Sequence, residues 1–279
     1  MGAPGKPTGR VLARGLGLLE SARWHAGEPW FSDWSSGTVY RARASGLEVM
    51  ARVPSLPLCF DFVGDELVVF DSASRRLLRG RVGGAQVPWA DVSQVGGAGN
   101  EIVAVADGGC YLNVGNFDPA QGFPTTPTGS VVHVDRTGGA RVVADGLAFP
   151  NGMAVTPDGS VLIVAESHAG RLTAFTIGAD GALTDRRVWA AIDGSAPDGI
   201  SLAPSGECWY ADVPNQQAVC VAEGATEPSR VIALDRGGFS CAVSPDGTRL
   251  FAVGADWANG AGMVDPNHDW DGTAWVFDL

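Results

Sequence analysis

Residues 153–177 read MAVTPDGSVLIVAESHAGRLTAFTI, and this stretch decides the fold. It contains an apolar run over 153–155, a Pro-Asp-Gly turn over 157–159, a second apolar run over 161–165 and an alternating run over 171–177. Short apolar runs separated by glycine-containing turns are typical of antiparallel strands joined by hairpins. We therefore predict consecutive β-strands here.

The same unit recurs along the chain. Each copy has a short apolar run, a glycine turn, a strand that ends in an acidic or small residue, another turn and a further strand. The clearest anchors are 30–33 (WFSD), 68–71 (VVFD), 111–114 (YLNV), 163–166 (IVAE), 209–212 (WYAD) and 250–253 (LFAV). They lie roughly 38 to 52 residues apart, which leaves room for four strands per repeat. The sequence therefore predicts an all-β fold, a six-bladed β-propeller that forms a single domain over residues 1–279.

A propeller ring has to close, because an open ring leaves unpaired strand edges exposed. We expect the last strand, 273–278, to pair with the N-terminal segment 10–14. An eight-stranded barrel or a sandwich is the alternative fold, but neither predicts repeats of this length. No stretch of about twelve residues combines helical periodicity with helix caps, so little helix is expected.

Composition narrows the function classes. The 279 residues include 31 acidic and 19 basic side chains, a net charge of −12, which opposes binding to nucleic acid or to an anionic membrane surface. No apolar run is long enough to span a bilayer, and no export or lipidation signal is visible, so we expect a cytoplasmic protein with a small-molecule substrate. The five cysteines are scattered and odd in number, which indicates buried thiols rather than disulfides or a zinc site.

Polar residues recur near the start of the innermost strand of the predicted repeats. Four repeats carry one there: Glu20, Asn100, Asn151 and Asp198. Repeats two and six instead have 58–60 (LCF) and 239–241 (FSC) near that point. Pseudo-symmetry of the ring should bring the four polar side chains together at one mouth of the central channel.

Two carboxylates and two amides in a partly buried site favour a bound divalent cation. The carboxylates repel one another unless a cation neutralises them, and all-oxygen ligation suits Ca²⁺, Mg²⁺ or Mn²⁺. Few protein ligands would leave coordination positions for water and substrate, as in catalytic sites. The alternative is that residues 151–152 and 198–199 are ordinary turn pairs and that Glu20 is a solvated strand end.

Other candidate residues are weaker. His168 follows a strand end and can approach the channel mouth, but a structural role is the simpler interpretation. The remaining histidines, His25, His133 and His268, show no zinc-ligand spacing. The glycine-rich segment 96–99 has no following helix and no P-loop lysine, so phosphate binding is not supported.

Three groups of motifs resemble one known family, that of senescence marker protein (regucalcin), gluconolactonase and luciferin-regenerating enzyme. The resemblance covers about residues 12 to 253, and its motifs are 20–24 (ESARW) with 30–33, 146–153 (GLAFPNGM) with 156–159 (TPDG) and 166–167, and 197–200 (PDGI) with 209–212. Proteins of this family are six-bladed propellers, which agrees with the repeat pattern.

The resemblance implies a site. It implies that Glu20, Asn151 and Asp198 hold one divalent cation (Ca²⁺, Mn²⁺, Zn²⁺ or Mg²⁺) and that Asn100 lies beside metal and substrate. Enzymes of the family hydrolyse lactones, with the residue that matches Asp198 as the proposed base. Sugar-lactone members commonly carry an arginine where this chain has Ala98. Gluconolactone is therefore not assumed as the substrate.

These observations lead to a functional hypothesis. We expect a divalent-metal-dependent hydrolase of a lactone or related cyclic ester, with Asp198 as general base and Asn100 orienting the carbonyl. The segment 115–124 is expected to cover the mouth, where Phe117 and Phe123 would contact the substrate, although an inert surface loop is equally consistent with its composition. A metal-dependent isomerase or cyclase on the same site, or a non-catalytic metal-binding propeller, are the alternatives.

Overall fold

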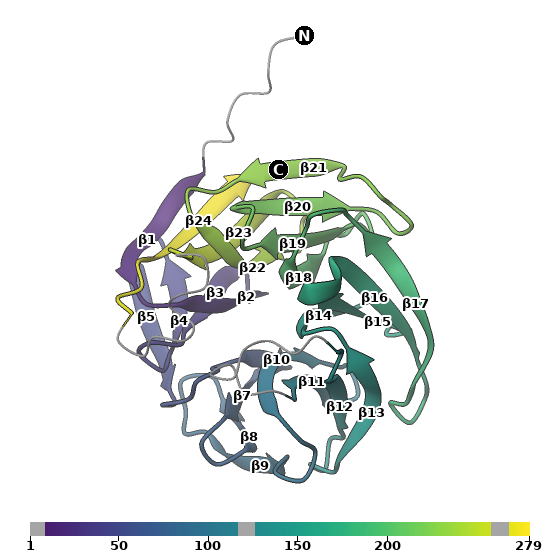
Figure 1. Ribbon diagram of the computed structural model, residues 1–279. Coiled ribbons are helices and arrows are strands. Elements are labelled where there is room, and N and C mark those ends of the chain that lie inside the picture. The colour runs from purple at the N-terminus through teal and green to yellow at the C-terminus, as the bar shows by residue number, and fades with distance from the viewer. Residues whose placement is uncertain (1–8, 117–125, 258–267) are drawn as a thin grey trace.

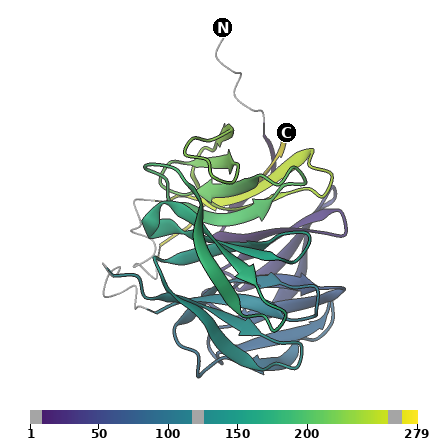
Figure 2. The same ribbon diagram turned by 90° about the vertical axis from the view of Figure 1, so that its right-hand side faces the viewer.

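The chain folds into a ring of six four-stranded antiparallel sheets, seen in the computed structural model that describes residues 9–116, 126–257 and 268–279. The sheets follow one another around the ring in chain order (Figure 1), and Figure 2 shows the ring from its edge. The prediction of a six-bladed β-propeller is confirmed.

The first three blades take their strands from consecutive hairpins, and the innermost strand is named first in each. Blade one contains β2 (Leu19–His25), β3 (Glu28–Asp33), β4 (Thr38–Arg43) and β5 (Gly46–Arg52). Blade two contains β6 (Phe60–Val63), β7 (Glu66–Asp71), β8 (Arg76–Arg81) and β9 (Val87–Asp91). Blade three contains β10 (Ala98–Ala104), β11 (Cys110–Gly115), β12 (Gly129–Val134) and β13 (Ala140–Leu147).

The next two blades follow the same order, and the sixth closes the ring. Blade four contains β14 (Pro150–Val155), β15 (Val161–Glu166), β16 (Arg171–Ile177) and β17 (Leu183–Ala191), with a 3₁₀ turn η2 (Ser167–Ala169) between its second and third strands. Blade five contains β18 (Pro197–Leu202), β19 (Cys208–Asp212), β20 (Gln217–Val221) and β21 (Arg230–Ala233). Blade six contains β22 (Gly237–Val243), β23 (Arg249–Ala255), β24 (Gly272–Asp278) and β1 (Arg10–Leu16).

The predicted ring closure is confirmed. The N-terminal strand β1 pairs antiparallel with the C-terminal strand β24, with Arg10 opposite Val276 and Arg14 opposite Thr273. This pairing satisfies the backbone groups that an open edge would leave exposed. Both ends of the described chain therefore stabilise the same blade (Figure 1).

Apolar side chains fill the spaces between neighbouring blades. Alternate residues of each strand face the next blade, so the core consists of successive clusters around the ring. Large side chains such as Trp30, Trp209 and Tyr111 are almost completely buried there. Within the described residues, we find no helix that is both long enough and apolar enough to cross a membrane. All five cysteines are buried and unpaired, as the sequence predicted.

Candidate metal centre

The four predicted polar residues occupy equivalent places on the inner strands. Glu20, Asn151 and Asp198 are each the second residue of their strands, β2, β14 and β18, and Asn100 is the third residue of β10. These strands surround the centre of the ring (Figure 1). The prediction that pseudo-symmetry relates the four positions agrees with this placement.

A break in strand pairing lies at each of these residues. In blade one, the pairing register between the innermost strand and the second strand shifts between Glu20 and Arg23. Equivalent shifts in blades three, four and five span Gly99–Glu101, Pro150–Met153 and Pro197–Ile200. Such bulges bend a strand and re-aim a side chain that would otherwise point between blades. Asn151-Gly152 and Asp198-Gly199 are therefore strand residues and not turn pairs.

Close approach of the inner strands explains the glycine after each of these two polar residues. A Cβ atom on Gly152 would lie 2.5 Å from the carbonyl oxygen of Asp198, and one on Gly199 would lie 2.2 Å from Oγ of Ser240. Side chains larger than hydrogen would push blades four, five and six apart. The Asn-Gly and Asp-Gly pairs therefore bring the polar side chains of successive blades together.

The candidate oxygen donors are buried. Glu20, Asn151 and Asp198 are each 7 % exposed. Asn100 is half-buried and donates a hydrogen bond from Nδ2 to Oδ1 of Asn151 over 2.9 Å. The Oδ1 atom of Asp198 is buried and has no hydrogen-bond partner. A buried carboxylate oxygen without a donor is costly, so this atom is a candidate ligand for a cation.

Burial and the negative charges of neighbouring acids disfavour ionisation of both carboxylates. Burial raises the pKa of Glu20 well above its ordinary value, and the charges of Asp198 and Glu101 raise it further. Burial likewise raises the pKa of Asp198, followed by the charges of Glu101 and Asp212. A cation between the carboxylates would remove this penalty.

The donor set fits a hard divalent cation. The described residues contain no cluster of three or more His, Cys, Asp or Glu side chains that could hold a metal ion. The residues at this mouth instead combine two carboxylates with the amide oxygen of Asn151, whose second lone pair is available. Oxygen-only donors of this kind suit Ca²⁺, Mg²⁺ or Mn²⁺. Glu20, Asn151 and Asp198 are the residues that could hold such an ion.

The raised pKa values predict a pH-dependent response to metal. Because the folded pKa of Glu20 and Asp198 exceeds the unfolded one, their protonated forms favour folding of the metal-free protein, and this contribution is lost as pH rises through the raised folded pKa. A bound cation favours the ionised forms. The gain in Tm on saturation with Ca²⁺ should therefore grow between about pH 5 and about pH 8.

Thermal scans of metal-free and Ca²⁺-saturated protein across this pH range would measure that gain. The control is the double variant Glu20→Gln and Asp198→Asn, which cannot ionise at either position and should show a much flatter response. A pH-independent gain in the unsubstituted protein would contradict a site built on these two carboxylates.

A buried ion pair that we did not predict lies further along the same inner strands. The Nη2 atom of Arg23 contacts Oε1 of Glu101 at 2.8 Å, and its Nε lies 3.4 Å from Oδ1 of Asp61. Glu101 also accepts a hydrogen bond from Oγ of Ser21. Arg23 thus compensates two acids next to the candidate centre. In the sequence, Glu101 stands out as a charged residue directly after Asn100. The sequence around one residue does not reveal which distant residue it pairs with.

Asn113 on β11 is a second contributor that the sequence did not single out. It is fully buried, donates from Nδ2 to the carbonyl oxygen of Asn151 and accepts from the backbone N–H of Glu101 over 3.0 Å. Asn113 therefore links the inner strands of blades three and four beside Asn100. Asn113 lies within the repeat motif at 111–114, but that motif does not indicate which way its side chain points.

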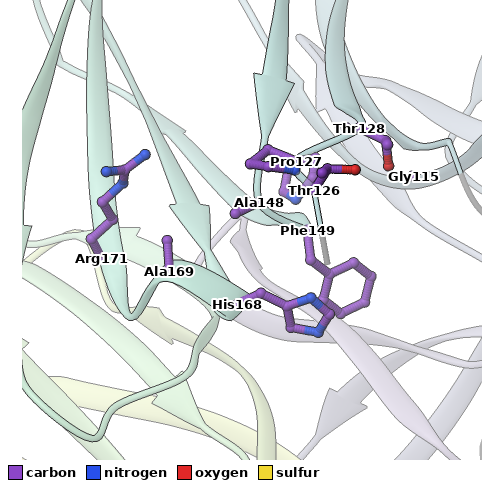
Figure 3. Close-up of a pocket in the computed structure, with 11 residues that line it drawn as sticks. Gly115, Thr126, Pro127, Thr128, Ala148, Phe149, His168, Ala169 and Arg171 are labelled. Carbon is purple, nitrogen blue, oxygen red and sulfur yellow. The ribbon is translucent and has the colours of Figure 1, made fainter. Parts of the chain in front are cut away.

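A cavity of about 330 Å³ lies between blades three and four, and its lining includes Pro150, the residue before Asn151 (Figure 3). Its walls include Pro127 and Thr128 on one side and Phe149 with His168 on the other. The rings of Phe149 and His168 face each other with centroids 4.7 Å apart. Phe149 has a positive φ of 58°, a strained conformation for a bulky residue and one that is frequent at functional sites. Burial lowers the pKa of His168, which favours the neutral ring.

Blade six carries an aromatic side chain at its equivalent bulge. Phe239 lies on β22 at the bulge between Gly238 and Ser240, which is equivalent to the position of Asn100 in blade three. Its ring packs against Trp257 at 5.7 Å and Trp270 at 6.1 Å, so blade six presents an aromatic cluster where its neighbours carry polar groups. Phe117 and Phe123, predicted to contact substrate, lie outside the described residues, as does most of the segment predicted to cover the mouth.

The remaining histidines have other neighbours. His25 is the last residue of β2, at the opposite end of the strand from Glu20, and it stacks on Phe62 with centroids 3.8 Å apart. His268 contacts Asp256 at 3.0 Å, and His133 is buried in β12. Burial raises the pKa of the Cys59 and Cys241 thiols, which argues against a nucleophilic thiolate at either position.

Three solved structures illustrate the similarity of this fold to known proteins. A luciferin-regenerating enzyme superposes with a TM-score of 0.79 at 16 % identity, over 97 % of this chain and 96 % of that one. A calcium-binding regucalcin from Agrobacterium tumefaciens gives 0.76 at 16 % identity, over 98 % and 95 %. A gluconolactonase from Xanthomonas campestris gives 0.74 at 20 % identity, over 95 % and 88 %. At these identities the likeness shows the fold alone.

The family relationship comes from the sequence itself. A search among curated proteins finds no match. The family model described as SMP-30/gluconolactonase/LRE-like region matches residues 18–255, which include all six innermost strands and the four polar positions. The chain therefore belongs to the SMP-30/gluconolactonase/LRE-like family.

Proposed function

We propose that this protein is a divalent-metal-dependent hydrolase of a lactone or related cyclic ester. The observation that carries the proposal is the buried Oδ1 atom of Asp198, which has no hydrogen-bond partner although it lies in a site with Glu20 and Asn151. Membership of a family that includes gluconolactonase, and the fold shared with a gluconolactonase and a calcium-binding regucalcin, support the same reading.

The residues divide into ligands and a base. Glu20, Asn151 and Asp198 would hold the cation through oxygen atoms. The bound ion would supply Lewis-acid stabilisation of the negative charge that develops on the lactone carbonyl oxygen. Asp198, kept ionised by the neighbouring cation, would accept a proton from the attacking water through a carboxylate oxygen. Asn100 uses one amide hydrogen on Asn151 and can direct the other towards the substrate.

Hydrolysis of a panel of aliphatic, aromatic and sugar lactones by metal-loaded and chelated protein tests the proposal. We expect at least one lactone to be opened only by the metal-loaded form. Isomerisation and cyclisation are followed in parallel by product analysis. A metal-loaded protein that converts a panel member to an isomer without releasing the hydroxy acid would contradict the hydrolase assignment.

The side chains around the mouth favour a weakly hydroxylated substrate. Phe149 and His168 line the cavity beside Pro150, and Phe239 on blade six packs against Trp257 and Trp270. Ala98 is exposed at the start of β10, at the position where sugar-lactone members commonly carry an arginine. Phe149 and His168 thus offer apolar contact, and Ala98 supplies no charge that could hold a hydroxyl group.

We therefore expect a higher kcat/KM for aliphatic or aromatic lactones than for gluconolactone. The variant Ala98→Arg should raise kcat/KM for gluconolactone by about tenfold, the value of one hydrogen bond to a charged group, and should leave apolar lactones little changed. Ala98→Gln is the matched control, with a comparably long but uncharged side chain. A preference of the unsubstituted protein for gluconolactone over every apolar lactone would contradict this prediction.

A further inference from the structure

Two blades end their second strand in a buried carboxylate that hydrogen bonds the backbone leading into the inner strand. In blade four, Oε2 of Glu166 accepts the N–H of Ala148 over 2.7 Å. In blade five, Oδ1 of Asp212 accepts the N–H of Ala196 over 3.3 Å. Both carboxylates belong to residues with no exposed surface. Each one therefore fixes a loop that enters the inner strand two or three residues before the polar residue of its blade.

Blade one repeats this arrangement. Oδ2 of Asp33, which is 3 % exposed, accepts the N–H of Gly17 over 3.3 Å, three residues before Glu20. The register is identical in the three blades, because each acid lies opposite the residue directly before the polar one. The opposed pairs are Leu19 with Asp33, Pro150 with Glu166 and Pro197 with Asp212.

The other three blades lack the arrangement in the part of the chain that the structure describes. Asp71 ends β7 in blade two, but it is only half-buried, and its hydrogen bonds go to Ala73 and Ser74 in its own turn. The residue opposite the one before Asn100 is Val114, and the corresponding residue in blade six is Gly254. Buried carboxylates of this kind thus occur in the three blades that carry Glu20, Asn151 and Asp198.

We propose that Asp33, Glu166 and Asp212 are positioning residues that hold the bulged strand ends of Glu20, Asn151 and Asp198 in the geometry needed to bind a cation. The inference rests on the metal site proposed above. A bulge leaves backbone groups unpaired and is free to shift unless a second interaction holds it. Loss of a group that orients a metal ligand typically lowers metal affinity by about 10 to 100 times.

The carboxylates are suited to this task because they accept several hydrogen bonds at once. Asp212 also accepts from Ser195 over 2.8 Å, Asn215 over 2.9 Å and Gln217 over 3.3 Å. An amide in its place would turn one acceptor atom into a donor that faces other donors.

Glu166 is held in the same way. Burial alone would raise its pKa, but hydrogen bonds from Thr173 and Ala148 and the charges of Arg171 and Arg186 outweigh burial and lower the pKa. Glu166 is therefore an anion at neutral pH, with both oxygens engaged.

The test compares Asp33→Asn, Glu166→Gln and Asp212→Asn with Asp71→Asn. The control removes the same charge at the equivalent strand end of a blade without a proposed ligand. Calcium affinity is measured by calorimetry on metal-free protein, and amide hydrogen exchange is followed at Gly17, Ala148 and Ala196. We expect each of the three variants to bind Ca²⁺ about 10 to 100 times more weakly, and Asp71→Asn to change affinity less than about twofold.

Two further variants separate position from charge. Glu166→Asp and Asp212→Glu keep the charge but displace the carboxylate by one methylene, so a positioning role predicts that the loss of affinity remains. Recovery of the original affinity in both would show a charge effect and overturn the inference, as would an equal loss in Asp71→Asn. If Glu166→Gln or Asp212→Asn does not fold, Glu166→Asp or Asp212→Glu takes its place in the affinity measurement.

Amide exchange distinguishes failure of this inference from failure of the metal site. We expect faster exchange of the tied amide in the substituted blade of the metal-free protein and no change in the other blades. If the unsubstituted protein binds no divalent cation, the proposed metal site is wrong, and the inferred effect of these acids on cation affinity is overturned with it. Unchanged exchange in all three variants would overturn the positioning role itself, whatever the protein binds.

Discussion

Asp198→Asn should bind the cation and fail to turn over. The amide keeps an oxygen donor for the ion but cannot accept a proton, and loss of a general base typically lowers the rate by about 10² to 10⁴. The expected loss is in kcat at saturating metal, because the base acts in the chemical step. Cation occupancy of the variant, checked by elemental analysis, separates weak metal binding from lost catalysis.

Asn151→Asp is the matched control for this prediction. It exchanges the same two functional groups in the opposite direction, adds a negative ligand and leaves the proposed base untouched. We expect it to be the milder change at saturating metal. If Asp198→Asn recovers to within about threefold of the unsubstituted protein when the site is full, a loss far below the general-base range, another group is the base.

Removal of divalent cations should abolish lactone hydrolysis. Glu20 and Asp198 are buried carboxylates with raised pKa values, and the free Oδ1 atom of Asp198 has no donor within the described protein. Thorough chelation should leave no activity above background, and addition of Ca²⁺, Mn²⁺ or Zn²⁺ should restore it. The measurement is the initial rate on the best lactone of the panel as a function of added cation.

Glu20→Gln provides the control for chelation. It keeps an oxygen donor but removes one negative charge, so restoration should require a higher cation concentration and reach a similar maximum. Full turnover in a preparation shown by elemental analysis to be metal-free would refute the metal dependence. Restoration of Glu20→Gln at the same cation concentration as the unsubstituted protein would remove Glu20 from the ligand set.

The fold was predictable because its signals are local. A strand and its hairpin partner are close in sequence, so an apolar run, an Asp-Gly turn and a second run such as 153–165 identify each other without knowledge of the rest of the chain. Repetition of that unit determined the number of blades. Closure followed from the requirement that no strand edge remain unpaired, and β1 pairs with β24 as expected.

The candidate site was predictable in its positions and not in its surroundings. Equivalence within the repeat identified Glu20, Asn100, Asn151 and Asp198, and the structure places them at equivalent bulged positions on the inner strands. The bulges themselves were not visible, because a single extra residue in one strand leaves no compositional trace. The cluster of Arg23, Glu101 and Asp61 was also missed, since its members come from three different blades.

The acids that end the second strands are equivalent in sequence but differ in burial and hydrogen bonding in the structure. Asp33, Asp71, Glu166 and Asp212 occupy the same place in the repeat, and by sequence they are equivalent. Asp33, Glu166 and Asp212 are buried and accept a backbone N–H that lies 16 or 18 residues earlier. Asp33 and Asp71 also accept from their own turns, and Asp71 is only half-buried.

The sequence alone thus determined the ring, its repeat and its polar positions, because period and hairpin chemistry act over short distances along the chain. Only the tertiary structure decided which carboxylates reach a neighbouring loop, because burial and hydrogen-bond partners depend on how strands distant in sequence approach one another.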